Sequence, residues 1–77
     1  MTKLKTLRTQ TDLKQSDVAN ACDLSLRSYQ NLEQGRDSID RCKLETLLRL
    51  CFCLNCKLSD ILEDENLVSL YEKTHRP

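Results

Sequence analysis

Glycine, proline and aromatic residues are scarce in this chain of 77 residues, which has one Gly, one Pro and 4% Phe, Trp and Tyr. The Pro is the last residue, so almost nothing interrupts regular backbone structure between the ends. β-Branched residues are sparse, whereas Leu, Lys, Arg, Glu and Gln are abundant, which favours helices over strands. The composition therefore argues against a sheet-based fold, and the length allows one domain.

Long hydrophobic runs are also missing. No segment approaches the length of a membrane span, and residues 1–5 lack the apolar stretch of a secretory signal. We therefore expect a cytoplasmic protein. Its five cysteines are expected to stay reduced there, and an odd number of thiols cannot all pair.

Neither sign of charge is in excess, because 12 Lys and Arg balance 12 Asp and Glu. The distribution is uneven: residues 1–58 hold ten basic and seven acidic side chains, a balance of +3, and residues 59–77 hold two and five, a balance of −3. An acidic end is expected to face away from a polyanion. The zero total predicts modest affinity of a single subunit for nucleic acid.

Residues that could carry catalysis or bind a metal form no convincing set. The sequence offers neither a base–nucleophile pair nor a phosphate-binding loop, so we expect no enzyme activity and no cofactor. Cys51, Cys53 and Cys56 suggest a metal site, but zinc needs a fourth ligand and a helix would place these thiols on different faces. We expect them to pack as small hydrophobic residues and bind no metal. A redox-sensing or metal-binding role is the alternative.

Apolar residues recur at helical spacing along the chain. This periodicity predicts helices over residues 3–10, 15–22, 26–34, 44–54 and 59–62, with a polar loop over 36–42. The fourth helix is expected to bury Leu44, Leu47, Leu48, Cys51 and Leu54. Leu67, Leu70 and Tyr71 indicate a sixth helix, which either folds back onto the core or forms a dimer contact.

Residues 15–34 have the pattern of two short helices that pack closely around a tight turn. Ala19 is small where the second helix crosses the first, and Asp23 suits a turn with positive φ. Ser25 can cap the second helix because its hydroxyl can accept from the free amides of the first turn. Gly35 follows that helix, where a left-handed residue is favoured. This pattern predicts a helix-turn-helix.

The sequence resembles the phage-repressor and Cro-type helix-turn-helix family, also called the XRE family, from about Leu4 to Leu62. The motifs that carry the resemblance are Leu7-Arg8, Leu13–Gln15, Val18-Ala19, Leu24-Ser25, Leu32–Gly35 and the Leu-rich fourth helix. It implies an all-α, five-helix, lambda-repressor-like DNA-binding domain over residues 1–63, with an acidic and helical tail over 64–77. Asp23 and Asn55 replace two family glycines, and both suit positive φ.

A further departure is Lys14, which stands where the family has a capping Ser or Thr. Lys cannot cap, so we expect this end of the second helix to fray, although its ammonium group could reach a phosphate.

The resemblance implies that the third helix, about Leu26–Gln34, lies in the major groove of duplex DNA. By position, the residues that face the bases are Leu26, Arg27, Gln30 and Asn31. The chemistry agrees, because Arg suits guanine and Asn suits adenine. The residues expected on the DNA backbone are Lys14, Gln15, Ser25, Arg36, Arg41 and Lys43. Arg8 and Glu33 correspond to a pair that the family joins by a partly buried, structural salt bridge.

These inferences predict a sequence-specific transcriptional regulator, a repressor, that binds double-stranded DNA as a homodimer through helix 5 and the tail. One alternative is a protein-interaction module, antitoxin-like or an adaptor, that keeps the fold without binding DNA. The zero net charge keeps this alternative open. Another is a thiol-based sensor on the same scaffold, whose DNA affinity would change on oxidation or on addition of zinc.

Overall fold

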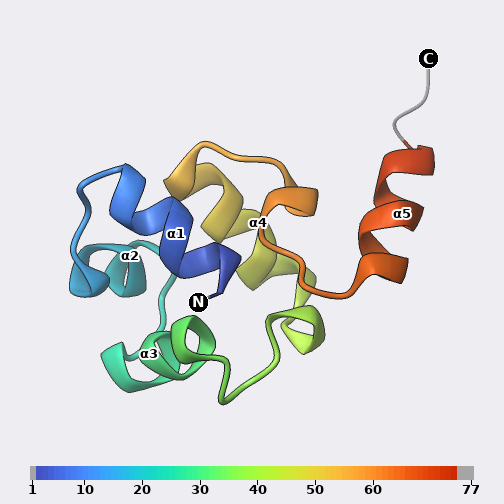
Figure 1. Cartoon of the computed structure of the whole chain (residues 1–77). Helices are drawn as coiled ribbons and strands as arrows, with labels where there is room; N and C mark the ends of the chain where they lie inside the picture. The colour runs from blue at the N-terminus through green and yellow to red at the C-terminus, as the bar shows by residue number, and fades with distance from the viewer. Residues whose placement is uncertain (1, 75–77) are drawn as a thin grey trace.

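A computed structural model describes residues 2–74 of the chain. The elements, in order, are α1 (Lys3–Gln10), α2 (Gln15–Ala21), α3 (Leu26–Gln34), the 3-10 turn η1 (Ile39–Arg41), α4 (Leu44–Leu54), the 3-10 turn η2 (Leu58–Asp60) and α5 (Glu65–Thr74) (Figure 1). No strand occurs among residues 2–74, and the predicted all-α class is confirmed. The first four helices have the predicted bounds, except that α2 ends one residue early.

Local interactions explain where the helices begin. The hydroxyl of Thr2 accepts a hydrogen bond from the Lys5 amide at 3.2 Å, and that of Ser25 accepts from the Ser28 amide at 3.1 Å. Lys14 contributes no capping side chain to α2, as expected. The Asp17 carboxylate instead accepts from the Lys14 amide at 3.1 Å, which is the second half of a capping box and counters the expected fraying.

Residues with positive φ explain where two helices end and how α2 turns into α3. Gly35 (φ 79°) closes α3 and Asn55 (φ 52°) closes α4, both in the left-handed region. Asp23 (φ 57°) forms the turn of the helix-turn-helix, as predicted. Asp and Asn tolerate this region better than most residues, so the fold does not need the family's glycines at these places.

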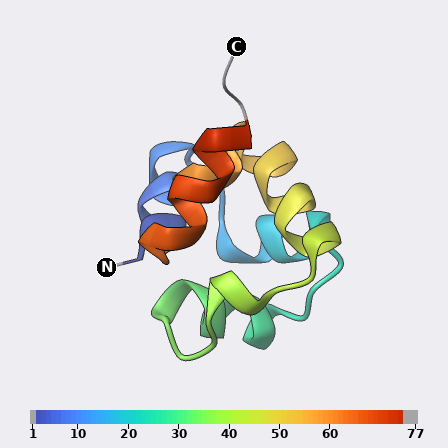
Figure 2. The same cartoon turned by 90° about the vertical axis from the view of Figure 1, so that its right-hand side faces the viewer.

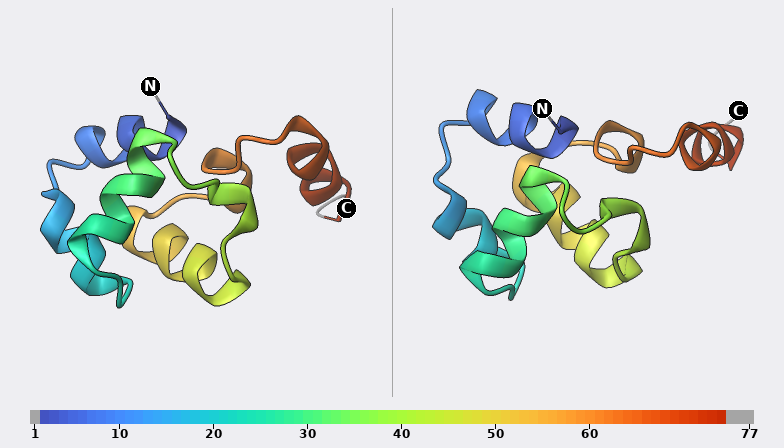
Figure 3. Two further views of the ribbon diagram at one scale, coloured as in Figure 1. Left: turned by 90° about the horizontal axis from the view of Figure 1, so that it is seen from below. Right: turned by 60° about the horizontal axis from the view of Figure 1, so that its bottom comes forward.

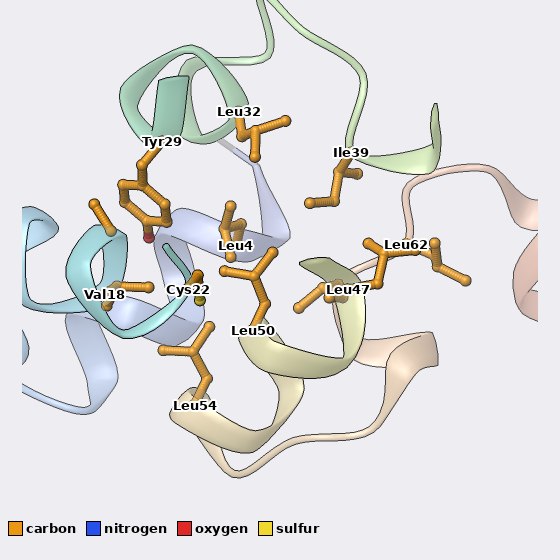
Figure 4. Close-up of a cluster of buried hydrophobic side chains, with 12 residues drawn as sticks. Leu4, Val18, Cys22, Tyr29, Leu32, Ile39, Leu47, Leu50, Leu54 and Leu62 are labelled. Atoms are coloured by element: carbon orange, nitrogen blue, oxygen red, sulfur yellow. The ribbon is translucent and has the colours of Figure 1, made fainter. Parts of the chain in front are cut away.

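The core lies where α1, α2, α3 and α4 converge (Figure 4). Leu4 and Leu50 are at its centre, 1% and 0% exposed. The buried apolar residues are Leu4, Val18, Ala19, Cys22, Tyr29, Leu32, Ile39, Leu47, Leu50, Leu54, Ile61 and Leu62. Each fully buried large aliphatic side chain contributes roughly 1.5–3 kcal/mol, so this small set holds the helices together.

The buried face of α4 differs from the prediction. Leu47 and Leu54 are buried with Leu50, whereas Leu44 and Leu48 are 62% and 53% exposed. The sequence of α4 carries two apolar stripes at helical spacing, so periodicity alone could not choose between them. Contacts of α4 with α2 and η2 decide which stripe is buried.

Two predicted segments also differ in detail. The segment 36–42, expected to be a polar loop, contains the turn η1 and buries Ile39 to 4% exposure. The short helix expected over 59–62 is the 3-10 turn η2, followed by the buried residues Ile61 and Leu62.

The tail forms the predicted additional helix, α5, which packs against η2 and stands to one side of the other helices (Figures 1, 2 and 3). None of its residues is buried; Leu67 and Val68 pack against the core, and Leu70 is 56% exposed. Only the beginning of α5 therefore packs against the core. Residues 75–77 of the expected tail lie outside the described residues. Across residues 2–74, no helix has the length and apolar character needed to span a membrane.

Candidate nucleic-acid interface

Helix α3 has one buried face and one exposed face. Tyr29, Leu32 and Glu33 are buried against the other helices. Among the residues predicted to face DNA bases, Arg27 is exposed and Leu26 is 44% exposed, whereas Gln30 and Asn31 are half-buried. Arg27 and Asn31 are one turn apart, as are Leu26 and Gln30, so the four residues form one continuous strip along the helix.

A single buried carboxylate fixes the position of α3. Glu33 is 1% exposed, and its two oxygens accept hydrogen bonds from three side chains on three helices. Arg8 on α1 donates from Nε to Oε2 at 2.5 Å and from Nη2 to Oε1 at 2.9 Å. The Tyr29 hydroxyl donates to Oε2 at 2.6 Å, and Gln15 Nε2 on α2 donates to Oε1 at 2.9 Å. These bonds join α1, α2 and α3 at one point.

The same contacts keep Glu33 ionised. Burial on its own raises the pKa of the Glu33 carboxyl, but the hydrogen bonds from Arg8, Tyr29 and Gln15 outweigh it and lower the pKa below its usual value. Burial, together with the hydrogen bond to Glu33, raises the pKa of Tyr29, so its hydroxyl remains a donor. Arg8 and Glu33 therefore form a charged pair, and the neutral donors Tyr29 and Gln15 enclose it.

Gln15 connects this buried group to the exposed strip of α3. Its Oε1 accepts a hydrogen bond from Gln30 Nε2 at 3.1 Å, while its own Nε2 donates to Glu33. A side-chain amide has two N–H groups, so the bond to Glu33 uses only one of them. Gln15, which was predicted to contact a phosphate, therefore also belongs to the set of residues that hydrogen-bond to Glu33, here called the framework. Its side-chain oxygen also orients Gln30.

The residues predicted to contact the DNA backbone lie on two sides of α3. Lys14 is exposed just before α2, and Arg36, Arg41 and Lys43 are exposed on the segment that joins α3 to α4. Figure 1 shows α3 between α2 and this segment. Ser25 is exposed, but its hydroxyl serves the chain itself: it accepts from the Ser28 amide and donates to the Ser28 hydroxyl at 2.9 Å.

A groove beside α3 brings predicted backbone-contacting residues together with charged residues that were not predicted to take part. Arg36, Arg41 and Lys43 line it together with Arg49 of α4. The acidic residues of its lining are Asp23, Asp37 and Glu45. Four cations against three carboxylates leave this surface only slightly positive, in keeping with the neutral composition of the chain.

Two residues of the framework were missed in the sequence. The hydrogen bond from Tyr29 to Glu33 was not predicted, although the spacing of four between these residues on one helix could have indicated it. The Thr2 hydroxyl donates to the backbone carbonyl of Glu33 at 2.6 Å, a contact across 31 positions that no local pattern signals.

The cysteines do not assemble into a metal site within residues 2–74, where no group of three or more His, Cys, Asp or Glu side chains could hold an ion. All five thiols are free. Burial raises the pKa of each, to about 11 for Cys22 and about 12 for Cys56, where Cys51 also contributes. Thiols of this kind are weak nucleophiles at neutral pH.

Comparison with known proteins agrees with this architecture. Residues 3–66 match the Cro/C1-type HTH DNA-binding domain, which covers α1 to η2 and the start of α5. No curated protein and no solved structure gives a significant match. The matched segment includes the α2–turn–α3 unit and the residues that bind it to α1. The chain belongs to the family of Cro/C1-type helix-turn-helix DNA-binding domains.

Proposed function

We propose that this protein is a sequence-specific transcriptional regulator, a repressor, that places α3 in the major groove of duplex DNA as a homodimer in the cytoplasm. The observation that carries the proposal is the exposed strip of α3, which the partly buried Arg8–Glu33 pair holds at a fixed orientation. A helix presented in this way can approach base edges without rearrangement of the core. No catalytic step is needed for this role.

The strip offers complementary chemistry for reading bases. Arg27 can donate two hydrogen bonds to the O6 and N7 atoms of guanine, and Asn31 can bond in a bidentate manner to adenine. Leu26 can contact a thymine methyl group. Gln30, oriented by its bond to Gln15, is the fourth base-contacting residue.

Contacts to phosphates would come from both sides of α3. The DNA strand near α2 would be contacted by Lys14 and by the second N–H of Gln15. The phosphates of the other DNA strand would be contacted by Arg36, Arg41 and Lys43, on the segment that joins α3 to α4. Ser25 can join them if its hydroxyl turns from Ser28 to a phosphate oxygen. A homodimer doubles these contacts, which compensates for the zero net charge of one chain.

Selection of bound duplexes from a random pool, at low salt and with protein verified as folded, tests the proposal. We expect enrichment of a two-fold symmetric site whose half-sites lie about one helical turn, or ~34 Å, apart. Lys73→Ala on α5, far along the chain from α3, is the matched control and should select the same site. Failure to enrich any sequence would overturn the proposal and favour a protein-interaction module.

A further inference from the structure

Helix α4 carries an apolar stripe that the core does not use. Leu44, Leu48 and Phe52 follow one another at a spacing of four, so they lie along one face of the helix. They are 62%, 53% and 91% exposed, and Phe52 is the single Phe of the chain. The core is served by the other stripe of the same helix. Three large apolar side chains that are exposed in a row along one helix face indicate a surface that is covered by a partner.

Charged residues of both signs border one side of this stripe. Arg49 pairs with Glu45 within α4, with Nη2 of Arg49 2.9 Å from Oε2 of Glu45, and both side chains are largely exposed. Ala21 at the end of α2 and Cys53 line the same shallow depression. The stripe is therefore flanked by one cation and one anion and has no excess of either charge.

We propose that a second copy of this chain covers the stripe, with the two α4 helices antiparallel and Leu48 at the two-fold axis. Leu44 then packs against Phe52 of the partner subunit, and the reverse contact follows by symmetry. The proposal rests on the homodimer of the proposed function and identifies its interface. Such a contact is isologous, so one surface patch must complement itself.

The charges of the stripe meet this requirement. At 1.5 Å of rise per residue, Glu45 lies about 4.5 Å before Leu48 along the helix axis and Arg49 about 1.5 Å after it. A two-fold axis through Leu48 brings Glu45 within about 3 Å, along the axis, of Arg49 of the partner subunit and on the same side of the interface. The same axis places the two Arg49 side chains about 3 Å apart along the helix axis, so each Arg49 lies between Glu45 and Arg49 of the partner subunit. Two intermolecular ion pairs can therefore form, and the repulsion between the two arginines offsets part of their attraction.

The tail helix is less suited to self-association. Its one largely exposed apolar residue is Leu70, and Glu65 and Glu72 lie on the same helix. Residues 59–77 carry a balance of −3, so pairing two tails would bring like charges together. A standard interface buries ~800 Å² per partner, and the α4 stripe consists of three apolar side chains on one helix face. We therefore expect weak association that binding of two half-sites strengthens.

A charge-exchange experiment tests the interface. Glu45→Arg creates a chain with two cations beside the stripe, and Arg49→Glu creates a chain with two anions. Each variant alone should associate at least tenfold more weakly than the natural chain, because like charges face each other across the axis. An equimolar mixture should recover association as a heterodimer, which native mass spectrometry identifies by mass. Sedimentation of the full chain without DNA, up to millimolar concentration, measures the affinities.

Leu48→Glu should abolish association by placing two carboxylates at the axis, and Leu70→Glu on α5 is the matched control that should not. Three results would overturn the proposal: a monomeric natural chain, variants that associate like it, or dissociation by Leu70→Glu, which would assign the contact to the tail. Circular dichroism verifies that each variant is folded. Binding of Leu48→Glu to a half-site at low salt reports on DNA recognition separately, so failure of the interface and failure of the proposed function are distinguishable.

Discussion

The guanidinium of Arg8 and the carboxylate of Glu33 form two hydrogen bonds in a side-by-side arrangement, from residues 25 positions apart on α1 and α3. Arg8 is 14% exposed and Glu33 is 1% exposed. Because the Tyr29 hydroxyl and the Gln15 amide occupy the remaining lone pairs of Glu33, the charge is fully satisfied despite its burial. The orientation of the exposed strip of α3 therefore depends on a buried group behind it.

Arg8→Ala should destabilise the protein strongly, by about 3–5 kcal/mol, because it leaves the buried Glu33 carboxylate without its counter-ion. Arg8→Lys should lose less, since an ammonium keeps the charge but not the planar bidentate geometry. Urea unfolding monitored by circular dichroism gives both values. The control is Arg49→Ala, which removes an exposed pair with Glu45 and should cost less than about 1 kcal/mol. Equal effects of the Arg8 and Arg49 changes would contradict this account.

Acid should unfold the protein partly through Glu33. Its folded pKa is lowered, chiefly because the hydrogen bonds from Arg8 and Tyr29 outweigh the effect of burial. The stability it contributes is therefore complete above the unfolded pKa of about 4.3, declines as pH falls below that value, and is lost once pH passes the folded pKa. Glu33→Gln should be less stable at neutral pH and should have a flatter stability profile below pH of about 4.3. Identical profiles for both proteins would show that Glu33 is not linked to acid unfolding.

Replacement of the residues proposed to contact bases and of those proposed to contact phosphates should affect DNA binding differently. Arg27→Ala or Asn31→Ala should cost about 1–3 kcal/mol of DNA affinity and relax preference at one base position. Lys43→Ala should weaken binding to every sequence alike. It should also lower the slope of the logarithm of the binding constant against the logarithm of the salt concentration by about one unit. Titration of the selected site and its single-base variants at several salt concentrations separates the two. Unchanged base preference in both α3 variants would remove this helix from the role of reader.

Gly35→Ala should cost about 1–2 kcal/mol through backbone conformation alone, because φ at this position is +79°. A side-chain clash is not expected, since the added Cβ would lie 3.7 Å from Thr2 Cγ2, an ordinary contact. A double-mutant cycle with Thr2→Ser, which removes that methyl group and keeps the hydroxyl, should therefore give no coupling. A large coupling energy would mean that crowding against Thr2 causes the loss.

The cysteine thiols should react slowly with iodoacetamide at neutral pH while the protein is folded. Burial raises the pKa of all five, so little thiolate is present. Mass spectrometry should show rapid labelling only after addition of denaturant. Rapid labelling of Cys51, Cys53 or Cys56 in the folded protein would instead support the thiol-sensor alternative.

Local rules were sufficient to predict much of this fold from the sequence. The bounds of α3 follow from Ser25 and Gly35, because a cap and a left-handed residue act within one helical turn. The buried face of α4 was predicted only in part. Leu47 and Leu54 are buried as expected, but Leu44 and Leu48 are exposed, since they have the same spacing as the buried leucines and only contacts with α2 and η2 distinguish them. The bonds that Glu33 receives from Gln15 and Thr2 join distant segments, so no pattern along the chain could predict them.

The contact between the Thr2 hydroxyl and the Glu33 carbonyl also bears on how the protein can be handled in the laboratory. Thr2 caps α1 and touches the last turn of α3, so a fusion partner attached immediately before it would sit next to the framework that orients the exposed strip. Helix α5, in contrast, contacts the body mainly through η2 and leads away from α3 (Figure 1). An affinity tag or fluorophore is therefore best joined after α5, where the added chain would leave DNA recognition undisturbed.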